Sequence, residues 1–358
     1  MPKKTTSTNA LSASLCGELM AKWKWYKSDI DGIKKNGLKV FSTFSCGGGS
    51  SYGYKLAGYE LLGNCEIDNK INAMYVKNHK PKYNFNMDIR DFNKLRSLPE
   101  ELHDLDILDG SPPCSTFSMA GEREKNWGKA KQFREGQKKQ VLDDLFFAFL
   151  ETVERLKPKV VVAENVDGMT KGKSKYYITM VINEFRKLGY EVQIFRLNAM
   201  FMNVPQSRVR IFFVANRMNF PKLTINPNEK PILFREVATK DNKPMNKNME
   251  TYRLMKNYMI DSDRTIGHIN LRVYNKNSSF TRNIIRFNKV YPTLISGGDD
   301  YREDLKYISD KEYISVSTFP QDYDFNGNPV KYVCGMSVPP RMMEYIAREI
   351  ARQWFRRE

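Results

Sequence analysis

Several kinds of residue that common sites and scaffolds require are scarce in this sequence. Only three histidines occur in 358 residues, so catalytic or metal chemistry built on histidine is disfavoured. The five cysteines are scattered and odd in number, and no CxxC pair or cysteine–histidine cluster is present. This pattern argues against a disulfide framework and against a zinc site. We therefore expect no bound metal.

Long apolar runs are also missing. No stretch is long enough to span a bilayer, and the first residues lack the apolar core of a signal peptide. The sequence therefore predicts a cytoplasmic protein with no membrane partner. Acidic residues are the minority, with 41 Asp and Glu against 58 Lys and Arg, which gives a net charge of +17. An excess of this size favours a polyanionic partner, and nucleic acid is the first candidate.

Short apolar segments alternate with segments of helical periodicity between residues 38 and 217. This alternation predicts an α/β fold with a mostly parallel, doubly wound sheet that helices cover on both faces. The segments expected as strands are residues 40–45, 59–67, a short run ending near 88, 105–108, 159–163, 190–197 and 210–215. The segments expected as helices are residues 71–78, 141–156 and 176–188. Residues 38–217 would therefore form the catalytic and cofactor-binding domain.

The remaining segments differ from this pattern. Residues 1–37 are expected to be an extension whose helix, from Leu11 to Tyr26, packs against the main domain. Residues 218–287 are rich in Asn, Lys, Arg and Met with little periodicity, and predict a second, smaller, irregular domain. Residues 288–358 return to the catalytic domain and end in a helix that begins after a pair of prolines.

A glycine-rich turn, residues 46–51, follows the first expected strand. No lysine follows the glycines, so a P-loop is disfavoured. Glu66 ends the next expected strand about 20 residues later, where an acidic residue commonly binds the ribose hydroxyls of a nucleoside cofactor. Asp88, at the end of the third expected strand, is consistent with an acceptor for an adenine amino group and equally with a solvated loop aspartate.

A cysteine follows two prolines just after the fourth expected strand. Pro112 and Pro113 cannot continue a central strand, and they stiffen the backbone ahead of Cys114. A thiol on a rigid turn at the carboxyl edge of an α/β sheet lies where such folds place their chemistry. Taken alone, Cys114 fits a nucleophile and a buried, inert cysteine about equally well.

Two further motifs carry charged side chains toward the same edge. Glu164 and Asn165 leave the fifth expected strand, and a carboxyl group in such a crevice can act as a proton donor beside Cys114. Arg208 and Arg210 occupy alternating positions before the last core strand. Both would point to one face and present planar donor forks to a phosphate or a base carbonyl.

The order of these motifs resembles that of the cytosine-5 DNA methyltransferases, in the small prokaryotic or phage form. The matching segments are residues 44–53, 66–68, 88–89, 110–114, 164–166, 206–210, 291–293, 318–323 and 335–340. Any one of these matches is weak evidence, but so many in the same order are specific. The resemblance implies a Rossmann-like methyltransferase fold, with residues 218–287 as the target-recognition domain.

The resemblance also implies a mechanism. The target cytosine would be flipped out of double-stranded DNA, because its ring cannot be reached within the stack. Cys114 would attack C6 while Glu164 holds and protonates N3, and Arg210 would bind the carbonyl oxygen of the base. Arg208 would help to position the loop or backbone, and Asn165 would orient the end of the Glu164 strand. Seven basic residues would form a mobile loop over DNA: Arg123, Lys125, Lys129, Lys131, Arg134, Lys138 and Lys139.

The implied methyl donor is S-adenosylmethionine, with S-adenosylhomocysteine as the product. The residues expected to bind it are Phe44, Ser45, Cys46, Gly47, Gly48, Gly49, Glu66, Ile67, Asp88, Ile89, Pro112, Met336, Ser337 and Val338. Among them, Glu66 would hold the ribose, Asp88 the adenine amino group, and Ile67 would pack on the adenine ring. The enzyme would act as a monomer on DNA, and a cognate restriction endonuclease is a further partner that the resemblance implies.

Two positions depart from the family pattern, and two alternatives remain open. The family usually has Gly at the position of Cys46 and Asn at the position of Met336. One alternative is an RNA cytosine methyltransferase of related fold, although Ser115 after Cys114 and the basic segment 218–287 favour DNA. The other is a catalytically dead DNA-binding regulator, against which the intact Cys114, Glu164 and Arg210 argue.

Overall fold

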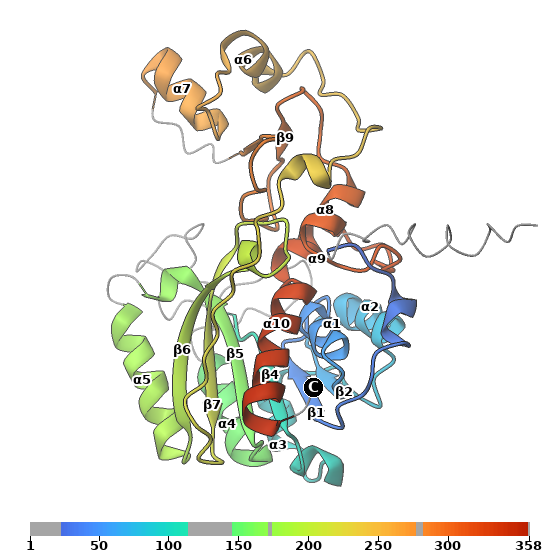
Figure 1. Cartoon of the computed structure of the whole chain (residues 1–358), viewed down its shortest axis with the longest axis vertical. Helices are drawn as coiled ribbons and strands as arrows, with labels where there is room; N and C mark the ends of the chain where they lie inside the picture. The colour runs from blue at the N-terminus through green and yellow to red at the C-terminus, as the bar shows by residue number, and fades with distance from the viewer. Residues whose placement is uncertain (1–22, 114–144, 171–173, 277–281, 357–358) are drawn as a thin grey trace, which may run out of the picture.

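The structure of the chain is a computed structural model that describes residues 23–113, 145–170, 174–276 and 282–356. A larger part is built on a seven-stranded sheet, and a smaller part above it contains helices α6 and α7 and strand β9 (Tyr301–Arg302) (Figure 1). The helices are α1 (Gly49–Leu56), α2 (Asn69–His79), α3 (Ile89–Lys94), α4 (Leu145–Leu156), α5 (Ser174–Lys187), α6 (Glu250–Tyr258), α7 (Ile266–Tyr274), α8 (Asp310–Val316), α9 (Val330–Met336) and α10 (Pro340–Ile350). A π-helical turn, Ala351–Phe355, extends the last of them.

The sheet has the strand order β3-β2-β1-β4-β5-β7-β6. Its strands are β1 (Lys39–Thr43), β2 (Glu60–Cys65), β3 (Tyr83–Phe85), β4 (Ile107–Gly110), β5 (Val160–Val166), β6 (Glu191–Asn198) and β7 (Val209–Asn216). Neighbouring strands from β3 to β5 are parallel, whereas β7 runs antiparallel to both β5 and β6. The prediction of a mostly parallel α/β sheet is confirmed.

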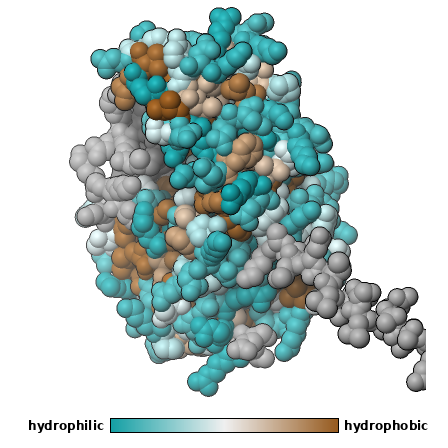
Figure 2. Space-filling model, turned by 45° about the horizontal axis from the view of Figure 1, so that its top comes forward, coloured by the Kyte–Doolittle hydropathy of each residue, from teal (hydrophilic) through white to brown (hydrophobic). Residues whose placement is uncertain are grey.

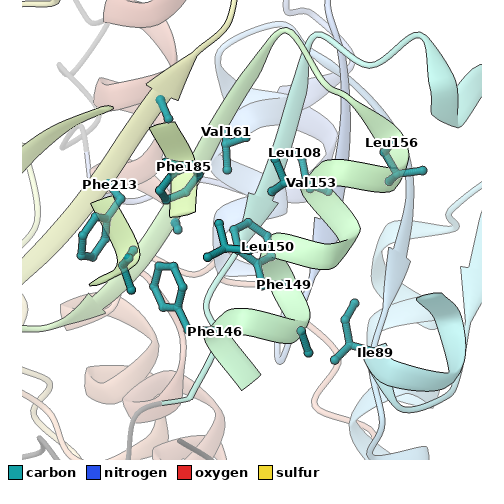
Figure 3. Packing of buried hydrophobic residues seen from close by; sticks show 14 of the residues in the cluster. Ile89, Leu108, Phe146, Phe149, Leu150, Val153, Leu156, Val161, Phe185 and Phe213 are labelled. Atoms are coloured by element: carbon teal, nitrogen blue, oxygen red, sulfur yellow. The ribbon is translucent and has the colours of Figure 1, made fainter. Parts of the chain in front are cut away.

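Alternation along the strands divides the core into two layers. Val160 and Val162 of β5 belong to the hydrophobic cluster under α1 and α10, whereas Val161 and Ala163 belong to the cluster under α3, α4 and α5. Both faces are therefore covered, as successive side chains of a strand point to opposite faces. Figure 3 shows α4 placing Phe149 and its neighbours against the second face.

Two expectations about individual elements need correction. The fifth strand was expected to end at Ala163, but β5 continues to Val166 because its last residues pair with β7. The expected helix from Leu11 lies mostly outside the described residues, and residues 23–26 are not helical. This segment nevertheless packs on the larger part, since the buried Trp25 donates its indole N–H to the Thr318 carbonyl at 2.8 Å.

The smaller part has a hydrophobic cluster of its own. Its buried members are Met245, Leu254, Met255, Ile266, Ile269, Ile284 and Tyr301. Residues 223 to 237 pack instead with the larger part, and Tyr301 lies beyond the boundary at 287 that composition predicts. The core of the smaller part therefore comprises residues between 245 and 301. It includes Tyr301 of β9, which follows residues 218–287 in the chain, because β9 packs with α6 and α7.

A buried polar network joins the two parts. Glu312 in α8 is fully buried, and its Oε1 accepts hydrogen bonds from Arg302 Nη1 and from the Thr239 backbone N–H, both at 2.9 Å. Its Oε2 accepts from the Ser309 N–H at 2.8 Å and from the Asn242 side-chain amide. Since Arg302 belongs to β9 and Glu312 to the larger part, this carboxylate fixes the joint between them.

The large hydrophobic side chains are mainly buried inside these clusters. The face drawn in Figure 2 is mostly hydrophilic, with apolar residues in small separate patches. Within the described ranges, no helix has both the length and the apolar character needed to cross a bilayer.

Replacing Arg302 with methionine should destabilise the protein strongly. Arg302→Met leaves the Glu312 carboxylate buried without its cation, which costs about 3–5 kcal/mol in the free energy of unfolding. Denaturant unfolding at neutral pH measures this change. Lys187→Met is the control, because Lys187 pairs with Glu184 at an exposed position and should have little effect. Equal stabilities of the two variants would contradict the role of the network.

Candidate active site

A cavity lies at the carboxyl ends of β1, β2 and β4, bounded by the starts of α1, α2, α3 and α10. Eleven of the predicted cofactor residues line it: Phe44, Ser45, Cys46, Gly49, Glu66, Ile67, Asp88, Ile89, Met336, Ser337 and Val338. Gly47, Gly48 and Pro112 do not. The other lining residues were not among the predicted cofactor-binding residues; they are Ser42, Ser50, Cys65, Asp68, Ile71, Met87, Asp109, Ser111, Pro113, Leu145 and Tyr332.

Most of these additional lining residues adjoin predicted ones in the chain, so their position next to a strand end could have identified them as cavity residues. Leu145 and Tyr332 are different. They reach the cavity from α4 and α9, where only tertiary packing decides which helix face is turned inward. No feature of the sequence marks them.

The glycine-rich turn brings the last part of the chain to the cavity. A Cβ atom on Gly49 would lie 2.0 Å from the Val338 carbonyl oxygen, so only glycine allows this close approach. Gly48 has φ +71°, and a Cβ there would lie 2.0 Å from His79 Nε2. Gly48 therefore faces the protein interior, which explains its absence from the lining.

Cys46 adopts φ +45° in the same turn. Glycine adopts this left-handed region without strain, and the family usually has glycine here. The Ser337 hydroxyl donates to Cys46 Sγ at 3.7 Å, which links the turn to the segment before α10.

Glu66 connects the turn to the end of β2. Its Oε2 accepts the Cys46 N–H at 2.9 Å, and its Oε1 accepts the Asp68 N–H at 3.0 Å. Burial raises the pKa of Glu66, while these backbone N–H donors oppose the rise. The carboxylate is thus held in a fixed orientation at the cavity wall.

The chemistry of the lining fits a nucleoside cofactor. Ile67 is 38% exposed although it is apolar, and it lies on the cavity wall together with Phe44 and Ile89. Asp88, beside them, accepts the Arg90 N–H at 2.9 Å as the N-cap of α3, so it is not a solvated loop residue. Apolar surfaces flanked by two carboxylates, Asp88 and Glu66, suit an apolar base attached to a hydroxylated sugar.

A buried ion pair lies on the neighbouring strands. Arg210 Nε and Glu164 Oε1 are 2.8 Å apart, and both side chains are only 12% exposed. Burial lowers the pKa of Arg210, and the adjacent Glu164 carboxylate opposes that effect. The antiparallel pairing of β5 with β7 creates this contact, because it brings Arg210 opposite Val166.

Asn165 ties β5 to the segment that leads to Cys114. Its side-chain amide donates to the Pro112 carbonyl oxygen at 3.2 Å, and its own oxygen accepts the Val166 N–H at 2.9 Å. Cys114 itself and the predicted basic loop lie outside the described residues. The contact nevertheless places the last described residues before Cys114 beside the Glu164 strand.

Arg208 does not present its donors alongside Arg210. It is 2% exposed, and it donates to the carbonyl oxygens of Leu294 and Gly335, each at 3.0 Å. Burial and the nearby charge of Arg210 lower the pKa of Arg208 to about 9, so the side chain stays charged at neutral pH. The expectation of two parallel forks is wrong because Arg208 is occupied in joining two distant backbone segments.

No group of three or more metal-binding side chains occurs within the described ranges. The cavity and the ion pair instead lie at one edge of the sheet. The cavity suits a small polar cofactor, and the ion pair suits a planar polar ring.

Comparison with known proteins agrees with this geometry. The family model described as C-5 cytosine-specific DNA methylase matches residues 38–352. Type II methyltransferase M.FnuDI of Fusobacterium nucleatum is 35% identical over 181 residues, which cover 50% of this chain and 47% of that protein. Type II methyltransferase M.HindV of Haemophilus influenzae is 27% identical over 332 residues, which cover 87% of this chain and 96% of that protein.

A solved structure shares the fold. DNMT2 of Spodoptera frugiperda, solved as a mutant, covers 87% of this chain and 99% of its own length, with a TM-score of 0.59. At 16% identity this likeness concerns the fold alone. The family match, in contrast, extends over most of the chain and includes all the predicted site residues. The chain therefore belongs to the family of C-5 cytosine-specific DNA methylases, the DNA cytosine-5 methyltransferases.

Proposed function

We propose that this protein methylates C5 of a cytosine flipped out of double-stranded DNA, through a covalent bond between Cys114 and C6. The observation that carries the proposal is the buried pair of Glu164 and Arg210 beside a cavity suited to a nucleoside cofactor. S-adenosylmethionine supplies the methyl group when it is bound and leaves as S-adenosylhomocysteine.

The ion pair supplies two different groups to one edge of a pyrimidine. Arg210 donates to the carbonyl oxygen of cytosine. Glu164 takes up a proton from solvent and passes it to N3, which activates C6 for attack. The Cys114 thiolate then bonds to C6, and C5 accepts the methyl group. Loss of the C5 proton restores the double bond and expels the thiolate. Each charge of the pair keeps the other oriented before the base arrives.

The other residues act as positioning groups. Asn165 fixes the segment that leads to Cys114, and Arg208 holds two backbone segments next to Arg210. Glu66 and Asp88 are the residues that would bind the ribose and the adenine amino group of the cofactor, with Ile67 against the ring.

The smaller part is the proposed target-recognition domain. Its separate core and its basic composition support contact with DNA bases and phosphates, and the net charge of +17 supports DNA as the partner. The relatives named Type II methyltransferases support a further proposal, namely that a restriction endonuclease with the same recognition site accompanies the enzyme. The enzyme would act as a monomer on DNA.

Replacing the proposed nucleophile tests the covalent step. Cys114→Ser should abolish methyl transfer, since a serine hydroxyl at neutral pH is a far weaker nucleophile than a thiolate. DNA that contains 5-fluorocytosine should trap the unmodified enzyme covalently, because fluorine cannot leave C5 as a proton does. Denaturing electrophoresis detects the adduct, and Cys16→Ser is the control that should still form it. Methylation by the Cys114→Ser variant would refute the mechanism.

Removing the Glu66 carboxyl group tests the cofactor site. Glu66→Ala should weaken S-adenosylmethionine binding, measured by calorimetry, by about 1–3 kcal/mol because a charged hydrogen bond to the ribose is lost. Glu60→Ala is the matched control at the exposed start of the same strand. If both variants bind as the unmodified enzyme does, the ribose is held elsewhere.

Exchange of the smaller part tests recognition. A chimera that takes residues 239–307 from a relative should methylate the relative's recognition sequence, and bisulfite sequencing of cellular DNA reads the outcome. The exchanged segment includes Tyr301 because Tyr301 completes the small core. A control chimera that exchanges only residues 1–22 should keep the original sequence. An unchanged recognition sequence in the first chimera would place recognition in another segment.

A further inference from the structure

The cofactor cavity is acidic although the protein is strongly basic. Among the residues that the structure describes, its lining contains four carboxyl groups, those of Glu66, Asp68, Asp88 and Asp109, and no Lys, Arg or His. The whole chain, by comparison, has a net charge of +17. A cavity of this kind favours a ligand that carries positive charge.

Backbone N–H groups already stabilise three of these four carboxylates. Glu66 accepts two such bonds, as described above. Asp68 accepts the N–H groups of Lys70 and Ile71 as the N-cap of α2, at 2.9 and 3.0 Å. Asp88 caps α3 in the same way. Their negative charges are therefore balanced by the protein itself.

Asp109 differs from the other three. It is 2% exposed, and within the described ranges its carboxylate accepts only two neutral hydroxyl donors, Ser42 Oγ at 2.8 Å and Tyr54 OH at 3.4 Å. The titratable groups that face it are Tyr54 on α1, Tyr75 on α2 and Glu164 on β5. None of these carries positive charge, so Asp109 has no cationic partner among the described residues. Burial, reinforced by the Glu164 charge, raises the pKa of Asp109 to about 7.

The strand order places Asp109 at the far end of the cavity from Asp88. Asp88 follows β3 and Asp109 is the penultimate residue of β4, with β2 and β1 between these strands. Three strand spacings separate them, or about 14 Å. If the adenine lies at Asp88, as in the proposed function, an extended S-adenosylmethionine directs its amino-acid tail toward Asp109.

We propose that the Asp109 carboxylate binds the ammonium group of the cofactor's amino-acid tail. This inference rests on the proposed cofactor and adds a binding residue at the opposite end of the site. Gly49 and Ser50, the first residues of α1, line the same cavity, and backbone N–H groups at a helix start suit the carboxylate of the tail. The tail is thus recognised as a zwitterion, with each charge facing its opposite.

Cofactor affinity should therefore depend on pH in a defined direction. Asp109 must be ionised to bind the ammonium group, so affinity falls as pH drops through the raised pKa of about 7. Between pH 7.5 and 6.0 the loss should be about sixfold, because the ionised fraction of Asp109 falls about eightfold while protonation of the α-amino group, whose ordinary pKa is about 7.7–8.0, rises slightly. 5′-Methylthioadenosine, which lacks the amino-acid tail, should bind equally well at both pH values.

The experiment measures binding of three ligands by calorimetry: S-adenosylmethionine, S-adenosylhomocysteine and 5′-methylthioadenosine. Asp109→Asn should weaken the first two by about tenfold or more, abolish their pH dependence, and leave the third unchanged. Weaker binding of S-adenosylmethionine alone would assign Asp109 to the sulfonium group and overturn the proposal. Weaker binding of all three would show that Asp109 only supports the structure, and would overturn it as well.

Asp88→Asn is the matched control, since asparagine also caps a helix and lies at the adenine end. It should weaken all three ligands alike, whereas Asp109→Asn should not. The unmodified enzyme gives a second test that needs no variant, because equal affinity for S-adenosylhomocysteine at pH 7.5 and 6.0 would overturn the proposal. Failure of the unmodified enzyme to bind either adenosyl amino acid would instead refute the proposed function.

Discussion

The close approach of Gly49 to Val338 is the constraint on which the site depends. The first βα turn and the segment before the last helix are almost three hundred residues apart in the chain, yet they pack against each other and both line one cavity. Any larger residue at position 49 would push the Val338 carbonyl away and open the wall. Tyr323 strengthens the same junction, since its hydroxyl donates to the Gly47 carbonyl at 2.8 Å. The C-terminal part of the chain thus packs directly against the first βα turn.

Most of the predicted residues that line the cavity share one property: they adjoin the ends of apolar strands. Glu66 and Asp88 could be located in this way, because the carboxyl ends of parallel strands meet at one edge. Glu164 was found by the same reasoning, although its strand is longer than expected. The pairing that extends this strand comes from β7, whose antiparallel direction does not follow from the alternation of strands and helices.

Other features depend on contacts between distant segments, and periodicity carries no information about them. Arg208 is an example, since its partners are the Leu294 and Gly335 carbonyls, which become neighbours only in the folded chain. Tyr332 enters the cavity for a similar reason. Asp109 lies just before Pro112 and Pro113 in the chain, but its two hydroxyl partners, and the absence of a cation beside it among the described residues, are visible only in the structure.

The joint at Glu312 has a consequence for chain length. Both ends of the segment between Thr239 and Arg302 are bonded to the same carboxylate. Within it, residues 245–284 leave the larger part, and Ile285, Tyr291 and Leu294 pack with the larger part again. This segment is therefore a closed loop. The entropic cost of closing a loop grows only with the logarithm of its length, so doubling the length costs about 0.6 kcal/mol. Insertions and deletions far from the joint should then change the stability of the catalytic sheet very little. The size of the smaller part can change over generations while the geometry around Glu164 and Arg210 stays the same.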